Sequence, residues 1–106
     1  MYVLFIKILN SNYKEDIFLA LESVEIREKV YFEAYNLDET VKDEIPLLKN
    51  FFQLEESEDK KITIITSFVD DKKRISEFIK VLEDIGLDLK KGRILKLGAF
   101  KSEIYL

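Results

Sequence analysis

The stretch that decides the fold is Ile62-Thr63-Ile64-Ile65-Thr66-Ser67-Phe68-Val69, followed at once by Asp70-Asp71. Eight residues rich in β-branched and aromatic side chains predict a strand. Ile64 and Phe68 fall on one side of this strand, whereas Ile65 and Val69 fall on the other. Both faces of the strand are therefore apolar.

Downstream of this strand, the sequence predicts a helix and a further strand. Asp70 or Asp71 can cap the helix, whose apolar stripe is Ile75, Phe78, Ile79, Leu82 and Ile85. Gly86 is placed to end the helix, and Arg93 to Leu97 predicts the next strand. Gly98 suggests a bulge or a bend, and Glu103 to Leu106 can add a short terminal strand.

Upstream, the same strand-helix-strand order occurs a first time. Val3 to Leu9 is nearly all apolar, as in a strand that is buried on both faces. Asn12 and Glu15 have the spacing of a capping box before a second amphipathic helix. Its apolar stripe is Tyr13, Ile17, Ala20, Leu21 and Val24. Val30 to Asn36 is rich in β-forming residues and predicts a strand.

An insert, residues 38–60, separates the two units. Pro46 interrupts any longer helix, but it suits the first turn of a short helix that reaches Gln53. The apolar stripe of that helix is Leu47, Leu48, Phe51 and Phe52, a spacing that favours core or interface packing over a ligand platform. The remainder of the insert is strongly acidic.

These elements predict one α+β domain over residues 1–106. The order βαββαβ is that of the ferredoxin-like fold, with an antiparallel sheet, two covering helices and a short extra helix in the central insert. Right-handed crossovers place both helices on one face of the sheet. Because the strands are apolar on both sides, we expect the second face to be buried between subunits.

The composition excludes several classes of function. The chain has no cysteine and no histidine, which removes thiolate chemistry, the commonest general base and the commonest metal ligand. There is no phosphate-binding loop, and paired carboxylates occur only as sequence neighbours, which are typical of solvated caps. We expect no enzyme activity, no cofactor and no metal site.

The hydropathy pattern bears on location. No apolar run approaches the roughly 20 residues that cross a bilayer. At the start of the sequence, the apolar residues precede the first charge, the reverse of a signal peptide. We therefore expect a cytoplasmic protein that does not insert into a membrane.

Charge is distributed unevenly along the chain. Residues 1–60 carry 7 basic and 14 acidic side chains, whereas residues 61–106 carry 10 basic and 7 acidic ones. The overall net charge of −4 argues against a nucleic-acid partner. Between Lys90 and Lys101, however, five side chains are basic and none is acidic.

The basic stretch contains the candidate site, Lys90, Lys91, Gly92 and Arg93. Glycine lets backbone amides approach an anion, lysine supplies charge, and arginine can bind a phosphate with two hydrogen bonds. The sequence therefore predicts a small anionic ligand here. The alternative is an ordinary solvated loop.

The last third of the chain resembles the nitrogen-regulatory PII superfamily. Residues 62–71 are similar to the strand and "VVDD" turn of that family, and Lys91 to Leu95 is similar to its "DGKIFV" strand. Phe100 to Leu106 resembles the closing strand of the family, and the long excursion between the second and third strands is shared as topology.

The resemblance implies a homotrimeric regulatory protein that binds adenine nucleotides or related molecules in clefts between subunits. By position, Gly92 matches the family glycine and Arg93 matches its phosphate-binding lysine. The acidic insert 38–60 would then contact a protein partner. The alternatives are a trimeric protein of the CutA type, or a stand-alone ferredoxin-like regulatory or structural domain without a nucleotide site.

Overall fold

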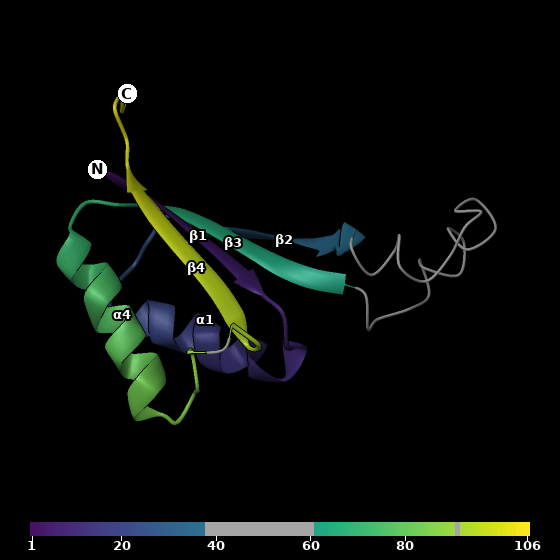
Figure 1. Ribbon diagram of the computed structural model, residues 1–106. Helices are drawn as coiled ribbons and strands as arrows, with labels where there is room; N and C mark the ends of the chain where they lie inside the picture. Colours follow the sequence, from purple (N-terminus) through teal and green to yellow (C-terminus); the bar gives the residue numbers. More distant parts are fainter. Residues whose placement is uncertain (38–60, 91) are drawn as a thin grey trace.

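The computed structural model describes residues 1–37, 61–90 and 92–106. Figure 1 shows this part of the chain as two layers, with both helices on one side of a twisted sheet. Its elements are β1 (Tyr2–Ile8), the 3-10 helix η1 (Ser11–Tyr13), α1 (Lys14–Ser23), β2 (Val30–Tyr35), β3 (Lys61–Val69), α4 (Lys72–Asp84) and β4 (Leu95–Lys101). The predicted α+β class is confirmed, and the helix predicted within the insert lies outside the described residues.

The sheet has the strand order β2-β3-β1-β4, and all neighbouring strands are antiparallel. The first strand of the chain therefore lies inside the sheet. Ile6 of β1 lies opposite Ile65 of β3 on one side and Leu97 of β4 on the other. Strands β2 and β4 form the two edges.

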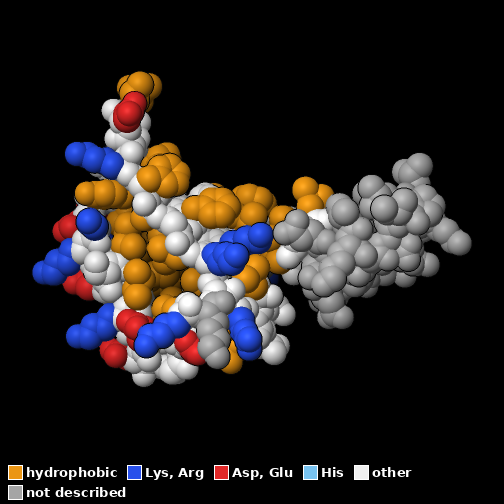
Figure 2. All heavy atoms as spheres, viewed as in Figure 1, with side chains coloured by type: hydrophobic (Ala, Val, Ile, Leu, Met, Phe, Trp, Pro, Cys, Tyr) orange, Lys and Arg blue, Asp and Glu red, His pale blue; other side chains and the backbone are white. Residues whose placement is uncertain are grey.

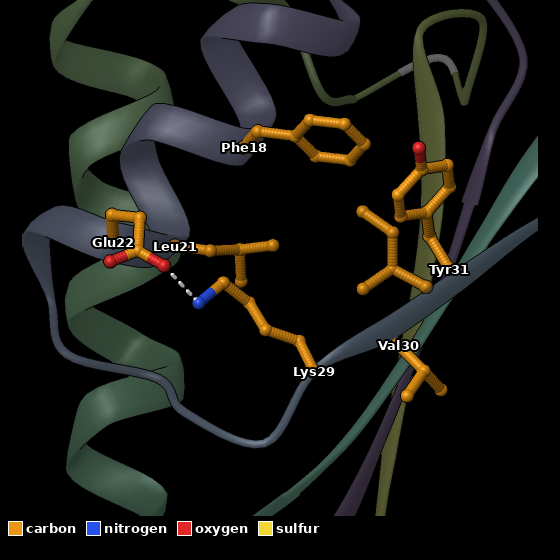
Figure 3. A pocket seen from close by; sticks show the side chains of 7 residues that line it. Phe18, Leu21, Glu22, Lys29, Val30 and Tyr31 are labelled. Atoms are coloured by element: carbon orange, nitrogen blue, oxygen red, sulfur yellow. Dashed lines mark hydrogen bonds and ion pairs between the residues drawn. The ribbon is translucent and has the colours of Figure 1, made fainter.

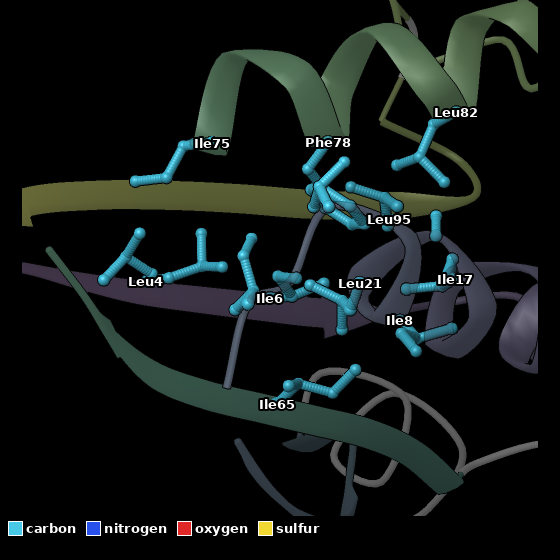
Figure 4. Close-up of a cluster of buried hydrophobic side chains, with 14 of the residues drawn as sticks. Leu4, Ile6, Ile8, Ile17, Leu21, Ile65, Ile75, Phe78, Leu82 and Leu95 are labelled. Carbon is cyan, nitrogen blue, oxygen red and sulfur yellow. The ribbon is translucent and has the colours of Figure 1, made fainter. Parts of the chain in front are cut away.

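The hydrophobic core lies between the helices and one face of the sheet, as Figure 4 shows. Alternate residues of β1 point into it, and the stripes of both helices meet them from the other side. The fully buried side chains are Leu4, Ile6, Ile8, Ile17, Leu21, Ile26, Ile65, Phe78 and Leu82. Burying each large apolar side chain contributes roughly 1.5 to 3 kcal/mol, so this cluster supplies most of the stabilisation.

The predicted cap of the first helix is wrong. Helical structure begins already at Ser11, and Asn10, in an extended conformation, provides the cap instead of Asn12. The Asn10 side chain accepts a hydrogen bond from the backbone N–H of Asn12 at 3.0 Å. The helix α1 itself follows at Lys14 without a side-chain cap.

The fourth strand also differs from its prediction. It begins at Leu95, and just before it the backbone oxygen of Ile94 accepts hydrogen bonds from the N–H groups of both Leu9 and Asn10, at 2.8 and 3.1 Å. It continues in unbroken register through Gly98, so no bulge occurs there.

The predicted terminal strand at Glu103 to Leu106 is absent. The ladder of β1 and β4 ends at Tyr2 and Lys101, and the backbone N–H of Ser102 adds one more bond to the oxygen of Met1 at 2.8 Å. Beyond this point, no strand of the described residues pairs with the tail.

The two ends of α4 agree more closely with the prediction from the sequence. Asp71 caps the helix by accepting a hydrogen bond from the N–H of Lys73 at 2.9 Å. At the other end, Gly86 has a φ of +97°, and the N–H groups of Gly86 and Leu87 donate to the oxygens of Glu83 and Leu82. This is a Schellman ending. Ile85, predicted to belong to the buried stripe, is 52% exposed because the helix ends before it.

Replacing Gly86 with alanine is expected to destabilise the domain. The left-handed conformation costs an ordinary residue about 1 to 2 kcal/mol, which lowers Tm by several degrees in a domain of this size. The matched control is Gly98→Ala, since Gly98 lies in an extended strand with no atom within 4 Å of the added methyl group. Equal losses of Tm in the two variants would contradict this assignment.

Candidate functional site

The described residues of the predicted site lie between α4 and β4, within residues 88–90 and 92–94, which we call the basic turn. The Asp88 carboxylate accepts a hydrogen bond from the backbone N–H of Lys90 at 3.1 Å. The backbone N–H of Gly92 donates a hydrogen bond to the backbone oxygen of Leu89 at 3.4 Å, and Gly92 adopts a φ of +59°. Glycine is suited to this position because the left-handed conformation is unfavourable for other residues.

The structure brings only some of the predicted residues together. Lys90 and Gly92 line one groove beside β4. Arg93 is exposed and is not part of that lining. Lys91 lies outside the described residues.

Lys96 joins the site, although it was not predicted as a site residue. A methyl group placed on Gly92 would lie 3.6 Å from Lys96 Cε, so the stem of the lysine passes over the glycine. Lys96 also lies directly opposite Lys7 across the β1–β4 ladder. No acidic side chain of the described residues forms an ion pair with either lysine.

The Lys7–Lys96 pair is electrostatically unfavourable in the free protein. Like charges directly opposite each other on neighbouring strands are destabilising. A bound anion, or an acidic group of a partner, would relieve the repulsion. The pair could not be found from sequence spacing, because it depends on the register of two strands nearly 90 residues apart.

The groove beside the basic turn has a volume of about 480 Å³. Its lining residues are Ile79, Leu89, Lys90, Gly92, Leu95, Lys96 and Leu97. In Figure 2, hydrophobic side chains are visible in the hollow between α4 and β4. The groove therefore combines aliphatic walls with the amines of two lysines.

A second cavity, of about 230 Å³, lies between α1 and the edge strand β2 (Figure 3). Phe18, Leu21 and Tyr31 project into it, and the ion pair of Glu22 with Lys29 lies at its margin. The hydrogen bond from Lys29 lowers the pKa of the Glu22 carboxyl below its ordinary value. Because this pair neutralises itself, it leaves no net charge for a ligand.

A third cavity, of about 560 Å³, lies at the opposite end of the sheet beside the loop between α1 and β2. The Arg74 side chain lines this cavity, but its guanidinium already contacts other groups of the protein. It donates to the backbone oxygen of Val24 at 3.2 Å and pairs with Asp70 and Glu25 at 3.4 and 3.6 Å. Both signs of charge are present, so the cavity specifies no ligand charge.

Glu33 forms a small polar cluster on the helix-facing side of β2. Lys14 binds its carboxylate at 2.8 Å, and the Thr63 hydroxyl donates to its two oxygens at 3.2 and 3.0 Å. The hydrogen bond from Lys14, followed by that from Thr63, lowers the pKa of Glu33 despite partial desolvation. These interactions connect the edge strand β2 to α1 and β3.

Within residues 1–37, 61–90 and 92–106, no three histidine, cysteine or acidic residues are grouped so as to hold a metal ion. In the same ranges, no helix is long and apolar enough to cross a membrane. Comparison with models of known protein families finds no match, and no curated protein matches the sequence.

Reversing one charge of the lysine pair should stabilise the free protein. Lys7→Glu places a carboxylate opposite Lys96, and opposite charges on facing strands contribute roughly 0.2 to 1 kcal/mol. The control is Lys101→Glu, because Lys101 lies opposite Tyr2 and gains no charged neighbour across the ladder. Chemical denaturation that gives the same free energy of unfolding for both variants would contradict the repulsion.

The Glu33 cluster predicts a pH-dependent contribution to stability. Because the pKa of Glu33 is lowered on folding, its contribution is present above the ordinary value of 4.5 and is lost as the pH falls through the folded value. Glu33→Gln should cost under about 1 kcal/mol at pH 7, since the ion pair is partly exposed. Its Tm should converge with that of the unmodified protein near pH 2.

The control for this pH series is Glu77→Gln, because Glu77 is exposed and has no ion pair among the described residues. Its Tm should follow that of the unmodified protein at each pH. A difference for Glu33→Gln that does not change with pH would show that the charge of Glu33 contributes nothing.

Proposed function

We propose that this protein is a PII-like regulatory domain that assembles as a homotrimer and binds a small anion, a nucleotide or another, between its subunits. One observation supports this most directly. Lys96, which lines the groove of the basic turn, lies in the same row of the sheet as Lys7, on the face that the helices leave uncovered. An assembly that buries this face would bring the basic turn to the edge of a subunit interface.

The topology supports the fold that this proposal requires. The described elements follow the order βαββαβ once the short 3-10 helix is set aside, and the strand order β2-β3-β1-β4 is compatible with a ferredoxin-like sheet. Fold alone does not determine function, since this scaffold carries many activities. The proposal therefore depends on the surface of the sheet and on the basic turn.

The uncovered face, which we call the open face, is strongly apolar. In the strand register it carries Phe5, Phe32, Phe68 and Phe100, which are between 39% and 58% exposed. Large contiguous apolar patches are rare on monomers and mark surfaces of interaction. Burial of this face between copies of the chain would remove four aromatic rings from water.

The charges of the site support an anionic ligand. Lys7, Lys90, Arg93 and Lys96 have no ion pair with an acidic side chain of the described residues. Such cations attract phosphate or carboxylate groups, and arginine binds them with a fixed two-pronged geometry. A nucleotide is the ligand that the sequence resemblance implies.

Three further expectations belong to this proposal. The protein would not catalyse a reaction. It would be located in the cytoplasm. The acidic insert 38–60, which lies outside the described residues, would be its contact with a protein partner.

The proposal is tested by molar mass from light scattering, with a nucleotide thermal-shift screen in parallel. We expect three times the chain mass of 12.5 kDa. Phe5→Asp should dissociate the trimer, because a carboxylate cannot be buried unpaired in the interface. The matched control is Leu19→Asp, which should leave the trimer intact because Leu19 lies on α1 and is 67% exposed.

In the screen, a nucleotide at 100 times its Kd stabilises the native state by about 2.7 kcal/mol, which raises Tm by several degrees. Arg93→Ala should weaken this shift without lowering the Tm of the free protein. A monomer would contradict the inter-subunit site. A trimer without any shift would instead favour a CutA-type or purely structural ferredoxin-like protein.

A further inference from the structure

The groove beside the basic turn has walls suited to an aliphatic chain. Ile79 faces it from α4, Leu89 from the turn, and Leu95 and Leu97 from β4. Leu95 belongs to the buried core, whereas Ile79, Leu89 and Leu97 are only partly buried. Apolar surface that remains in contact with water favours a ligand that covers it.

The groove arises from the position of β4 at the edge of the sheet. No further strand covers β4 on its outer side in the described part of the chain. In Figure 2, the hollow between α4 and β4 is open, and hydrophobic side chains are visible within it. A ligand could therefore enter from solvent without a rearrangement of the core.

In the described part of the lining, the charged groups are two cations, Lys90 and Lys96. Asp88, two residues before Lys90, accepts the backbone N–H of Lys90 and is not part of the lining. Lys7, opposite Lys96, adds a third positive charge nearby. An anionic head group at the rim would neutralise this charge, and a cationic one would be repelled.

The lining is poorly suited to a nucleobase. Among the described residues, it contains no aromatic side chain on which a base could stack, and apart from the two amines it has no polar side chain that could read the edge of a base. Inorganic phosphate would satisfy the lysines but would leave the aliphatic walls uncovered. A ligand with both a tail and an anionic head would use both parts of the groove.

We propose that the groove binds an anionic amphiphile, an aliphatic chain that ends in a carboxylate or a phosphate. The chain lies along Ile79, Leu89 and Leu97, and the head lies between Lys90 and Lys96. This inference deepens the proposed function by naming the class of the anionic ligand, and it rests on the same basic turn.

Calorimetry with acetate, hexanoate, octanoate, decanoate and octyl phosphate tests the ligand class, at concentrations below micelle formation. Each methylene group that enters the groove contributes about 0.8 kcal/mol, so affinity should rise about fourfold per methylene until the groove is filled. Octanol and octylammonium have the same tail without the negative charge, and inorganic phosphate has the charge without the tail. These three should bind at least tenfold more weakly than octanoate or octyl phosphate.

Two variants locate the site. Lys96→Gln should weaken octanoate at least tenfold, whereas Lys101→Gln, on the same strand but outside the lining, should not. Leu97→Trp should block the tail, while Leu19→Trp on α1 should leave binding unchanged. Equal binding of octanol, or octanoate binding that survives Leu97→Trp, would overturn the proposal.

Vesicles of phosphatidylglycerol and phosphatidylcholine separate the two sources of such a ligand. Binding to vesicles with the same dependence on Lys96 and Leu97 identifies a membrane lipid, and binding only to the free compounds identifies a dissolved amphiphile. If Leu97→Trp lowers the molar mass and no amphiphile binds, the groove is an interface between copies and the proposal fails.

The two proposals fail in different ways. ATP binding that depends on Arg93 in a trimer, with no response to octanoate, would leave the proposed function standing and would overturn the amphiphile. Octanoate binding that depends on Lys96 and Leu97 in a monomer would do the reverse.

Discussion

The structure depends on the place of β1 between β3 and β4. A strand with neighbours on both sides has its backbone hydrogen bonds satisfied within the sheet, and its side chains must alternate between two faces. Leu4, Ile6 and Ile8 point to the helices and are fully buried. Phe5 points the other way, where the described chain provides no covering layer. The exposed apolar side chains of this second face are the basis of the assembly proposed above.

The pairing register of β1 and β4 also determines which positive charges face each other. Lys7 and Lys96 come from distant parts of the sequence, and antiparallel pairing sets them opposite each other. Gly92, with a φ of +59°, lies beside the stem of Lys96 and provides the left-handed conformation of the basic turn. The lysine pair, the open face and the groove therefore all involve one strand, β4.

Much of the fold could be predicted from local patterns. The stripes of both helices, the strand ending at Val69, the cap at Asp71 and the glycine ending at Gly86 depend on residues close in sequence. The helix cap at Asn10 and the exposed Ile85 were local errors, whereas the absent bulge and the absent terminal strand occurred where a distant segment decides the outcome. Gly98 remains in regular pairing because β1 holds it opposite Phe5.

The candidate site was only partly predictable for the same reason. The basic turn was visible as a run of cations around a glycine, and Lys90 and Gly92 do line one groove. Its aliphatic walls were not visible, because Ile79 and Leu97 are brought together by the packing of α4 beside β4.

The sequence by itself determined the α+β class, the amphipathic helices and the absence of histidine and cysteine chemistry, because composition and short-range periodicity are properties of the chain alone. Only the tertiary structure decided which cations face each other, which apolar residues remain uncovered, and where the groove lies. These features depend on strand register and on the packing of elements distant in the chain. A shift of one residue in that register would have moved Lys7 to the opposite face.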